Sequence, residues 1–173
     1  MELKEAFLQE FDQEMAKTRK MLKRVPDDKL EWKPRETMWS LGQLATHLAN
    51  LPVWIASTIS RESLDMHPEG EEPARVAPAK SRQEILDRFD ENVRENRKSL
   101  EGAGEPHLMN SWSLLSGGKT LFTLPRLAVL RSFVLNHIIH HRGQLGVYLR
   151  MNDVAVPGMF GPSADEEKAR DQQ

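Results

Sequence analysis

The segment NHIIHHRGQLGVYLR, which runs from Asn136 to Arg150, contains three histidines in a stretch of five residues. His137 and His141 are four residues apart, so in an α-helix both side chains lie on one face, one turn apart. Two neutral imidazoles at this spacing can bind the same metal ion, as they do in the His-x-x-x-His helices of zinc enzymes. His140 lies on the flank of that face, where it could bind, support a ligand or face solvent.

The same spacing also fits an ordinary helical core, because buried imidazoles can be hydrogen-bonded to Ser, Asn or backbone groups instead of a metal. His47 strengthens the metal interpretation, since it lies on the apolar side of another predicted helix, in QLATHLANLPVW. Helical proteins commonly build metal sites from facing side chains of different helices. Three imidazole ligands leave coordination positions for water or substrate, which is typical of a working site rather than a closed structural one.

Other candidate residues have weaker support. His67 and His107 lie in predicted loops, and we expect both to face solvent without a role. Asn50, Arg142 and Gln144 are candidates for contacts to the ligands or the substrate. For Arg142 and Gln144, a helix-surface or interhelical contact is an equally good interpretation. Three tryptophans could shape a pocket mouth, although core packing is the preferred interpretation of each: Trp39, Trp54 and Trp112.

Apolar periodicity predicts the helices that position these side chains. The first helix runs from Leu3 to Val25, with apolar residues three and four apart, and ends at Pro26. The second begins after Ser40, which forms a capping-box pattern with Gln43. We expect this helix to kink at Pro52.

The second half of the chain predicts two further helices. Ser81 and Glu84 repeat the capping pattern before the third helix, which ends at Gly102. The fourth helix runs from near Pro125 to about Asn152 and carries the three clustered histidines. Between these helices, EPHLMNSWSLLSGGKTLFTL either is a long loop or contains a hairpin turn at its Ser-Gly-Gly-Lys sequence.

These elements predict an all-α fold, a four-helix bundle with long connections, in one domain over residues 1–173. A chain of 173 residues is long enough to bury a sizeable core. Residues 61–80 contain three prolines in MHPEGEEPARVAPAK, and we expect a surface loop there. Residues from about 165 to 173 are expected to be a frayed tail.

Charge and composition argue against several classes of function. The net charge is −2 and no basic patch or tail stands out, so we expect no nucleic-acid partner. The chain has no cysteine, which excludes disulfides, thiolate ligands and a cysteine nucleophile. Neither a signal peptide nor an apolar stretch of about 20 residues is found, and we therefore expect a soluble, cytoplasmic protein with no membrane partner.

The chain resembles the DinB-like superfamily, the damage-inducible and YfiT-type proteins, over most of its length. The resemblance depends on WSLGQLATHLANLPVW and NHIIHHRGQLGVYLR, and VPDDKLEWKP and VPGMFGPSADE support it. It implies that His47, His137 and His141 form a three-histidine site for a divalent metal, commonly nickel or zinc, whereas His140 matches no ligand position. It also implies the four-helix bundle and a homodimer.

The resemblance leaves two hypotheses for function. Family members include transferases and isomerases that use low-molecular-weight thiols such as mycothiol or bacillithiol, and some relatives are called metal-dependent hydrolases. We therefore expect a metal-dependent enzyme for a small-molecule substrate, either an S-transferase with a thiol co-substrate or a hydrolase, with no catalytic residue assigned. The alternative is a non-catalytic, metal-stabilised stress-response dimer, in which the ion joins the second helix to the fourth.

Overall fold

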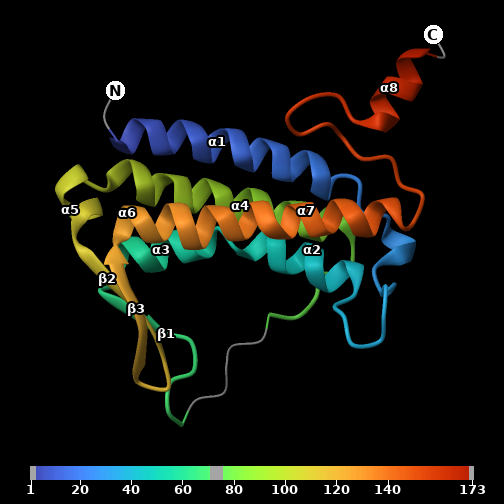
Figure 1. The fold of residues 1–173 in the computed structure, drawn as a ribbon. Coiled ribbons are helices and arrows are strands. Elements are labelled where there is room, and N and C mark those ends of the chain that lie inside the picture. Colours follow the sequence, from blue (N-terminus) through green and yellow to red (C-terminus); the bar gives the residue numbers. More distant parts are fainter. Residues whose placement is uncertain (1–2, 71–75, 172–173) are drawn as a thin grey trace.

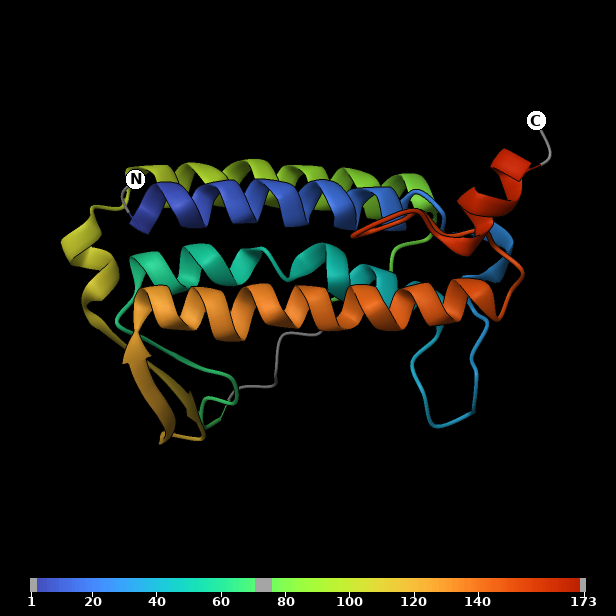
Figure 2. The same cartoon turned by 45° about the horizontal axis from the view of Figure 1, so that its top comes forward.

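The computed structural model describes residues 3–70 and 76–171 of the chain. Long helical segments lie side by side, and a small sheet lies at one end of them (Figure 1). Helices α1 and α4 form one layer, and the second layer contains α2 followed by α3 and α6 followed by α7 (Figure 2). The helices are α1 (Leu3–Leu22), η1 (Asp27–Lys29), α2 (Leu41–Asn50), α3 (Val53–Ser60), α4 (Arg82–Gly102), α5 (Glu105–Met109), α6 (Arg126–Val129), η2 (Leu130–Leu135), α7 (Asn136–Arg150) and α8 (Ala164–Asp171).

The prediction of an all-α four-helix bundle is wrong, because the described residues also form a three-stranded mixed sheet. Strand β1 (Ser63–Asp65) pairs in parallel with β2 (Ser111–Ser116), and β2 pairs antiparallel with β3 (Lys119–Pro125). The sheet covers a second, smaller hydrophobic cluster of Trp112, Leu114 and Val129, beside the main core between the helices. The strands therefore extend the apolar interior beyond the helices.

The β2–β3 hairpin resolves the segment for which the sequence left a loop or a hairpin open. Its turn is Gly117–Gly118, and both glycines have positive φ, 58° and 72°. A two-residue turn of this kind requires positive φ at both positions, which glycine adopts without strain. Asp65 accepts hydrogen bonds from the N–H groups of Gly117 (3.0 Å) and Gly118 (2.7 Å), so the end of β1 holds the turn in place.

The break between α2 and α3 lies at Leu51–Pro52, where the sequence predicted a kink. Proline cannot donate a backbone hydrogen bond, so a helix interrupted there leaves backbone groups that need other partners. Asn92 of α4 donates to the carbonyl oxygen of Ala49 (3.0 Å). Asn96, which is 4% exposed, accepts from the N–H of Ala56 (2.9 Å). The two asparagines thus hold α4 against both sides of the break.

Both predicted capping residues lie at helix N-termini. Ser40 accepts from the N–H of Gln43 (3.2 Å) and the Gln43 side chain accepts from the N–H of Ser40 (2.8 Å), which is a complete capping box. Ser81 likewise accepts from the N–H of Glu84 (3.1 Å), but the Glu84 carboxylate accepts from Lys80 instead of Ser81. The cap of α2 is important for the site because it fixes where the turns that carry His47 begin.

The helix that carries the histidine pair is not uniform. It begins with α6, continues through the π-helical segment η2, and becomes regular again in α7. Such π turns are rare and are frequently found at functional sites. A π turn inserts one residue, so it rotates the face of the following helix by about 100° relative to the preceding one.

Two regions that were predicted to be irregular contain ordered elements. Residues 61–80 include β1, and Ala79 is buried with its N–H donated to Thr46 Oγ1 (2.9 Å); residues 71–75 lie outside the described part. In place of a frayed tail, α8 covers Ala164–Asp171, while residues 172–173 lie outside the described part. None of the helices in residues 3–70 and 76–171 combines the length and apolar composition that a membrane span requires.

Replacing Asn96 with alanine is expected to lower the free energy of unfolding by about 1–3 kcal/mol, because the N–H of Ala56 loses its partner in a buried place. Urea denaturation measures this change. Glu91→Ala, an exposed substitution on the same helix, should change the value by less than about 0.5 kcal/mol. Equal stability of Asn96→Ala and the unmutated protein would contradict this role of Asn96.

Candidate metal centre

His47 of α2 and His137 and His141 of α7 come together where these two helices pack side by side. One ring nitrogen from each lies within 4.8 Å of the other two. His47 Nε2 and His137 Nε2 are 3.4 Å apart, and the ring centroids of His47 and His141 are 4.6 Å apart. The three side chains are half-buried. The structure therefore brings the predicted ligand set into one cluster.

The spacing of these nitrogens fits a shared metal ion. Histidine nitrogens lie about 2.0–2.1 Å from a tetrahedral zinc ion, so two of them on one ion lie roughly 3.3–3.4 Å apart. The 3.4 Å separation of His47 Nε2 and His137 Nε2 matches that value. The third nitrogen lies within 4.8 Å of the other two, so it needs a shift of at most about 1.4 Å to reach the same spacing.

Burial keeps the cluster neutral. Burial, together with the charge that neighbouring His141 would carry, lowers the pKa of His47 and of His137 from 6.5 to about 4. Burial also lowers the pKa of His141, whereas the hydrogen bond that its ring donates to Gln144 raises this pKa. Metal ions bind the neutral imidazole, so at neutral pH no proton has to leave before a metal binds.

Gln144 fixes the orientation of the third ring. Its Oε1 lies 2.7 Å from His141 Nδ1, so Nδ1 carries the proton and donates it, and Nε2 is left to bind a metal. Partners of this kind are common on metal-binding histidines. His140 is exposed and takes no part in the cluster of ligand nitrogens. The sequence placed Gln144 only among candidate contacts, and the structure gives it this specific one.

Two aromatic side chains flank the histidines. Trp39, in the connection before α2, packs edge-on to His47 (centroids 4.9 Å apart) and stacks on His141 (5.9 Å, interplanar angle 27°). Phe133 of the π segment packs edge-on to His137 at 5.9 Å. Trp39 is nevertheless 47% exposed, so it covers the cluster from the solvent side. These rings supply much of the apolar surface that buries the imidazoles.

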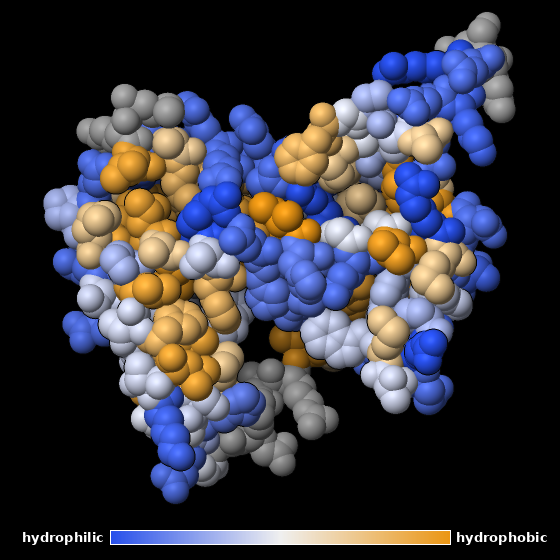
Figure 3. Space-filling view, in the orientation of Figure 1, coloured by the Kyte–Doolittle hydropathy of each residue, from blue (hydrophilic) through white to orange (hydrophobic). Residues whose placement is uncertain are grey.

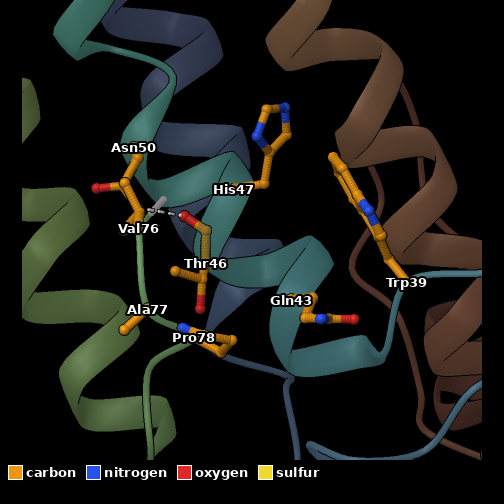
Figure 4. A pocket seen from close by; sticks show the side chains of 8 residues that line it. All are labelled: Trp39, Gln43, Thr46, His47, Asn50, Val76, Ala77 and Pro78. Atoms are coloured by element: carbon orange, nitrogen blue, oxygen red, sulfur yellow. Dashed lines mark hydrogen bonds between the residues drawn. The ribbon is translucent and has the colours of Figure 1, made fainter. Parts of the chain in front are cut away.

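A pocket of about 640 Å³ opens beside His47. In the orientation of Figure 1, the surface is hollowed below α7, between the sheet and the loop before α2 (Figure 3). Figure 4 shows Trp39 on one side of His47, and Thr46 and Asn50 on the other, near the segment that precedes α4. The lining residues are Trp39, Gln43, Thr46, His47, Asn50, Val76, Ala77 and Pro78. A small molecule in this pocket would contact a ligand histidine directly.

The family model for the DinB family matches residues 1–172. The chain belongs to the DinB family. It is 27% identical over 161 residues to the uncharacterized protein YrdA of Bacillus subtilis, covering 92% of this chain and 89% of that protein.

Two solved structures share the fold of this DinB protein. A DinB-like protein from Bacillus cereus is 26% identical, with a TM-score of 0.69 over 89% of this chain and 95% of the other. The DinB-like protein YjoA from Bacillus subtilis has a TM-score of 0.65 over 88% of this chain and 96% of its own; at 20% identity it supports the fold alone.

Arg142, a candidate contact residue from the sequence, lies away from the histidines of this DinB protein. It is 3% exposed, and its guanidinium pairs with Glu14 of α1 at 2.6 Å and donates to Thr18 Oγ1 at 3.3 Å. Burial raises the pKa of Glu14, but hydrogen bonds from Lys17 and Arg142 outweigh this effect and lower it. Arg142 therefore joins α7 to α1 and balances a buried charge.

The remaining candidates separate into pocket and core. Asn50 and Trp39 line the pocket, whereas Trp54 and Trp112 belong to the cluster beneath the sheet, as core packing predicted. His107 is half-buried, contrary to the expectation, and its Nε2 donates to the carbonyl oxygen of Ile59 (2.8 Å). His67 is exposed, as expected. Sequence reasoning missed Thr46 and the segment Val76–Pro78, because nothing in a proline-rich connection indicates that it returns to α2.

The metal-free protein should lose stability as the pH falls from about 6.5 to about 4. Between these values the unfolded histidines, with a pKa near 6.5, bind protons that folded His47 and His137, with a pKa of about 4, do not. Urea denaturation at several pH values should therefore give a shallower dependence for the double variant His47→Gln, His137→Gln. The exposed control His140→Gln should keep the slope of the unmutated protein; equal slopes in all three proteins would contradict the prediction.

Proposed function

We propose that this DinB protein is a divalent-metal-dependent enzyme that acts on a small molecule bound beside His47. One observation carries the proposal: three neutral imidazoles offer nitrogens within 4.8 Å of one another, at the edge of a pocket of about 640 Å³. Three ligands leave at least one position open on a four-coordinate ion. An open position beside a pocket is typical of catalytic rather than structural metal sites.

The proposed ligands are His47, His137 and His141, and nickel and zinc are the proposed ions because imidazole suits both. A divalent ion held there would supply a Lewis acid that lowers the pKa of a thiol or of water. Other residues of the chain orient the ligands, restrict water and position the substrate. Gln144 orients His141, Trp39 and Phe133 restrict water around the rings, and the pocket positions the substrate against His47.

Of the two reaction types, the lining favours a thiol S-transferase over a hydrolase. Attack by water benefits from a general base, most often a histidine or a carboxylate, within hydrogen-bond reach of the nucleophile. The described lining residues contribute an indole, amides, a hydroxyl and aliphatic groups beside His47, a proposed ligand. A nearby cation lowers the pKa of a thiol, so the thiol ionises at neutral pH without such a base. Since the chain has no cysteine, the thiol belongs to a small molecule.

Metal content tests the site. After incubation with zinc or nickel and dialysis, elemental analysis should find about one equivalent in the unmutated protein and in the control His140→Ala. His47→Ala and His141→Ala should each lose most of it, because two imidazoles bind more weakly than three. No metal in the unmutated protein, or full metal in both ligand variants, would refute the proposed site.

Turnover tests the reaction. The metal-loaded protein should transfer low-molecular-weight thiols to an electrophilic acceptor, and His47→Ala should abolish this activity. Metal binding without thiol-dependent or hydrolytic turnover would refute the enzyme proposal. The ion would then act as a link between α2 and α7 in a non-catalytic protein.

Removing the partner of His141 should weaken metal binding without removing a ligand. Gln144→Leu is expected to reduce zinc affinity by about 10–100-fold, because His141 is then free to rotate and to change tautomer. Competition with a chelator measures this affinity. The matched control Gln13→Leu, on the exposed face of α1, should leave it unchanged. An affinity of Gln144→Leu equal to that of the control would contradict the orienting role.

A further inference from the structure

The polar side chains of the pocket beside His47 are largely engaged in holding the protein itself. Thr46 Oγ1 accepts from the N–H of Ala79 (2.9 Å), and Asn50 Nδ2 donates to the carbonyl oxygen of Thr46 (2.8 Å). Asn50 Oδ1 accepts from Asn92 (3.3 Å), and Gln43 Oε1 accepts from the N–H of Ser40 (2.8 Å). Apart from the hydrogens left on the two amide nitrogens and on the Thr46 hydroxyl, these groups have little to offer a ligand.

The surface that the pocket does offer is apolar. Trp39 and Val76 line it from opposite sides of His47 and are 47% and 58% exposed, and Ala77 and Pro78 continue the wall beside Val76 (Figure 4). Apolar surface that a ligand removes from water contributes roughly 25 cal/mol per Å². The wall therefore favours a ligand with an apolar body of its own.

The charges around the pocket also favour an uncharged ligand body. Apart from His47, all the described lining residues have uncharged side chains. Arg88 donates to the carbonyl oxygen of Ala77 (2.9 Å), but its own charge is balanced by Glu84. An ionised group brought against these residues would lose hydration without gaining a counter-charge from the described lining, which is costly.

We propose that the ligand of this pocket is a molecule with one metal-binding donor, such as a thiol, and an uncharged aromatic or branched aliphatic body that lies between Trp39 and Val76–Pro78. The inference rests on the proposed function for the donor and goes beyond it by naming the substrate class. It predicts that thiols whose bodies carry carboxylates bind poorly.

A matched pair of thiols tests the class on the zinc-loaded protein. Phenylmethanethiol should bind at least tenfold more tightly than 4-(mercaptomethyl)benzoate in calorimetric titrations, although both have the same donor and ring. The carboxylate could itself bind zinc, so any bias of the assay favours the charged compound. Equal or tighter binding of 4-(mercaptomethyl)benzoate would overturn the inference.

A second arm uses the metal-free protein, so that it does not depend on the proposed function. Phenylmethanol should shift the NMR signals of the Trp39 indole and the Val76 amide, and benzoate at the same concentration should not. If the protein takes up no metal and phenylmethanol still binds at Trp39, the proposed function fails and the class of ligand stands. If zinc binds but neither phenylmethanethiol nor phenylmethanol does, the inference fails and the metal site stands.

A lysine in place of Val76 should remove the preference of the pocket for the uncharged thiol over the carboxylate. Val76→Lys is expected to bind 4-(mercaptomethyl)benzoate at least tenfold more tightly than the unmutated protein does, because the carboxylate then gains a partner. Val147→Lys is the matched control, since Val147 is equally exposed (57%) and lies outside the lining. The control should keep the original preference. An unchanged preference in Val76→Lys, with the fold intact by circular dichroism, would overturn the placement of the ligand's body.

Discussion

The packing of α2 against α7 is the contact on which the candidate site depends. One ligand histidine comes from α2 and two from α7, so neither helix holds more than part of the cluster. Apolar residues next to the histidines, Leu44 and Leu48 in α2 and Leu145 in α7, are 0–2% exposed. Burying each stabilises the contact by about 1.5–3 kcal/mol. The imidazoles thus lie at the border of a hydrophobic interface that positions them.

The face that α7 turns toward α2 explains why its histidines stay outside the core. The deeply buried positions of this helix include Ile138 and Arg142, each one residue after a histidine and therefore about 100° further around the axis. Arg142 turns toward Glu14 of α1, while His137 and His141 turn toward His47. A buried ion pair and the histidine cluster thus occupy separate faces of one helix. The π segment before them sets this rotation relative to α6.

The clustering of the three histidines was predictable from sequence because the signal is local: His137 and His141 are one turn apart, and His47 lies on a recognisable apolar stripe. The sheet could not be predicted in the same way. Strand β1 has only three residues, and β2 buries Trp112 and Leu114 in a cluster that forms only when β3 and α6 pack on it. The π segment could not be predicted either, because the spacing of its apolar residues does not distinguish it from an α-helix. The segment Val76–Pro78 is held at the pocket by a long-range hydrogen bond from the N–H of Ala79 to Thr46, and no sequence pattern indicates this bond.

The position of the cluster also bears on whether an ion would serve the fold or a reaction. A structural ion is most useful where apolar contacts are too few, and it is usually enclosed by four protein ligands. In this DinB protein the hydrophobic core already joins α2 to α7. Asn92 and Asn96 already form hydrogen bonds with the backbone groups on both sides of the break that follows α2. The three histidines add little that this packing lacks, yet they lie beside a pocket whose apolar wall is partly exposed. One set of residues provides the stability of this contact and another forms the histidine cluster beside the pocket, and that division favours chemistry as the role we propose for the site.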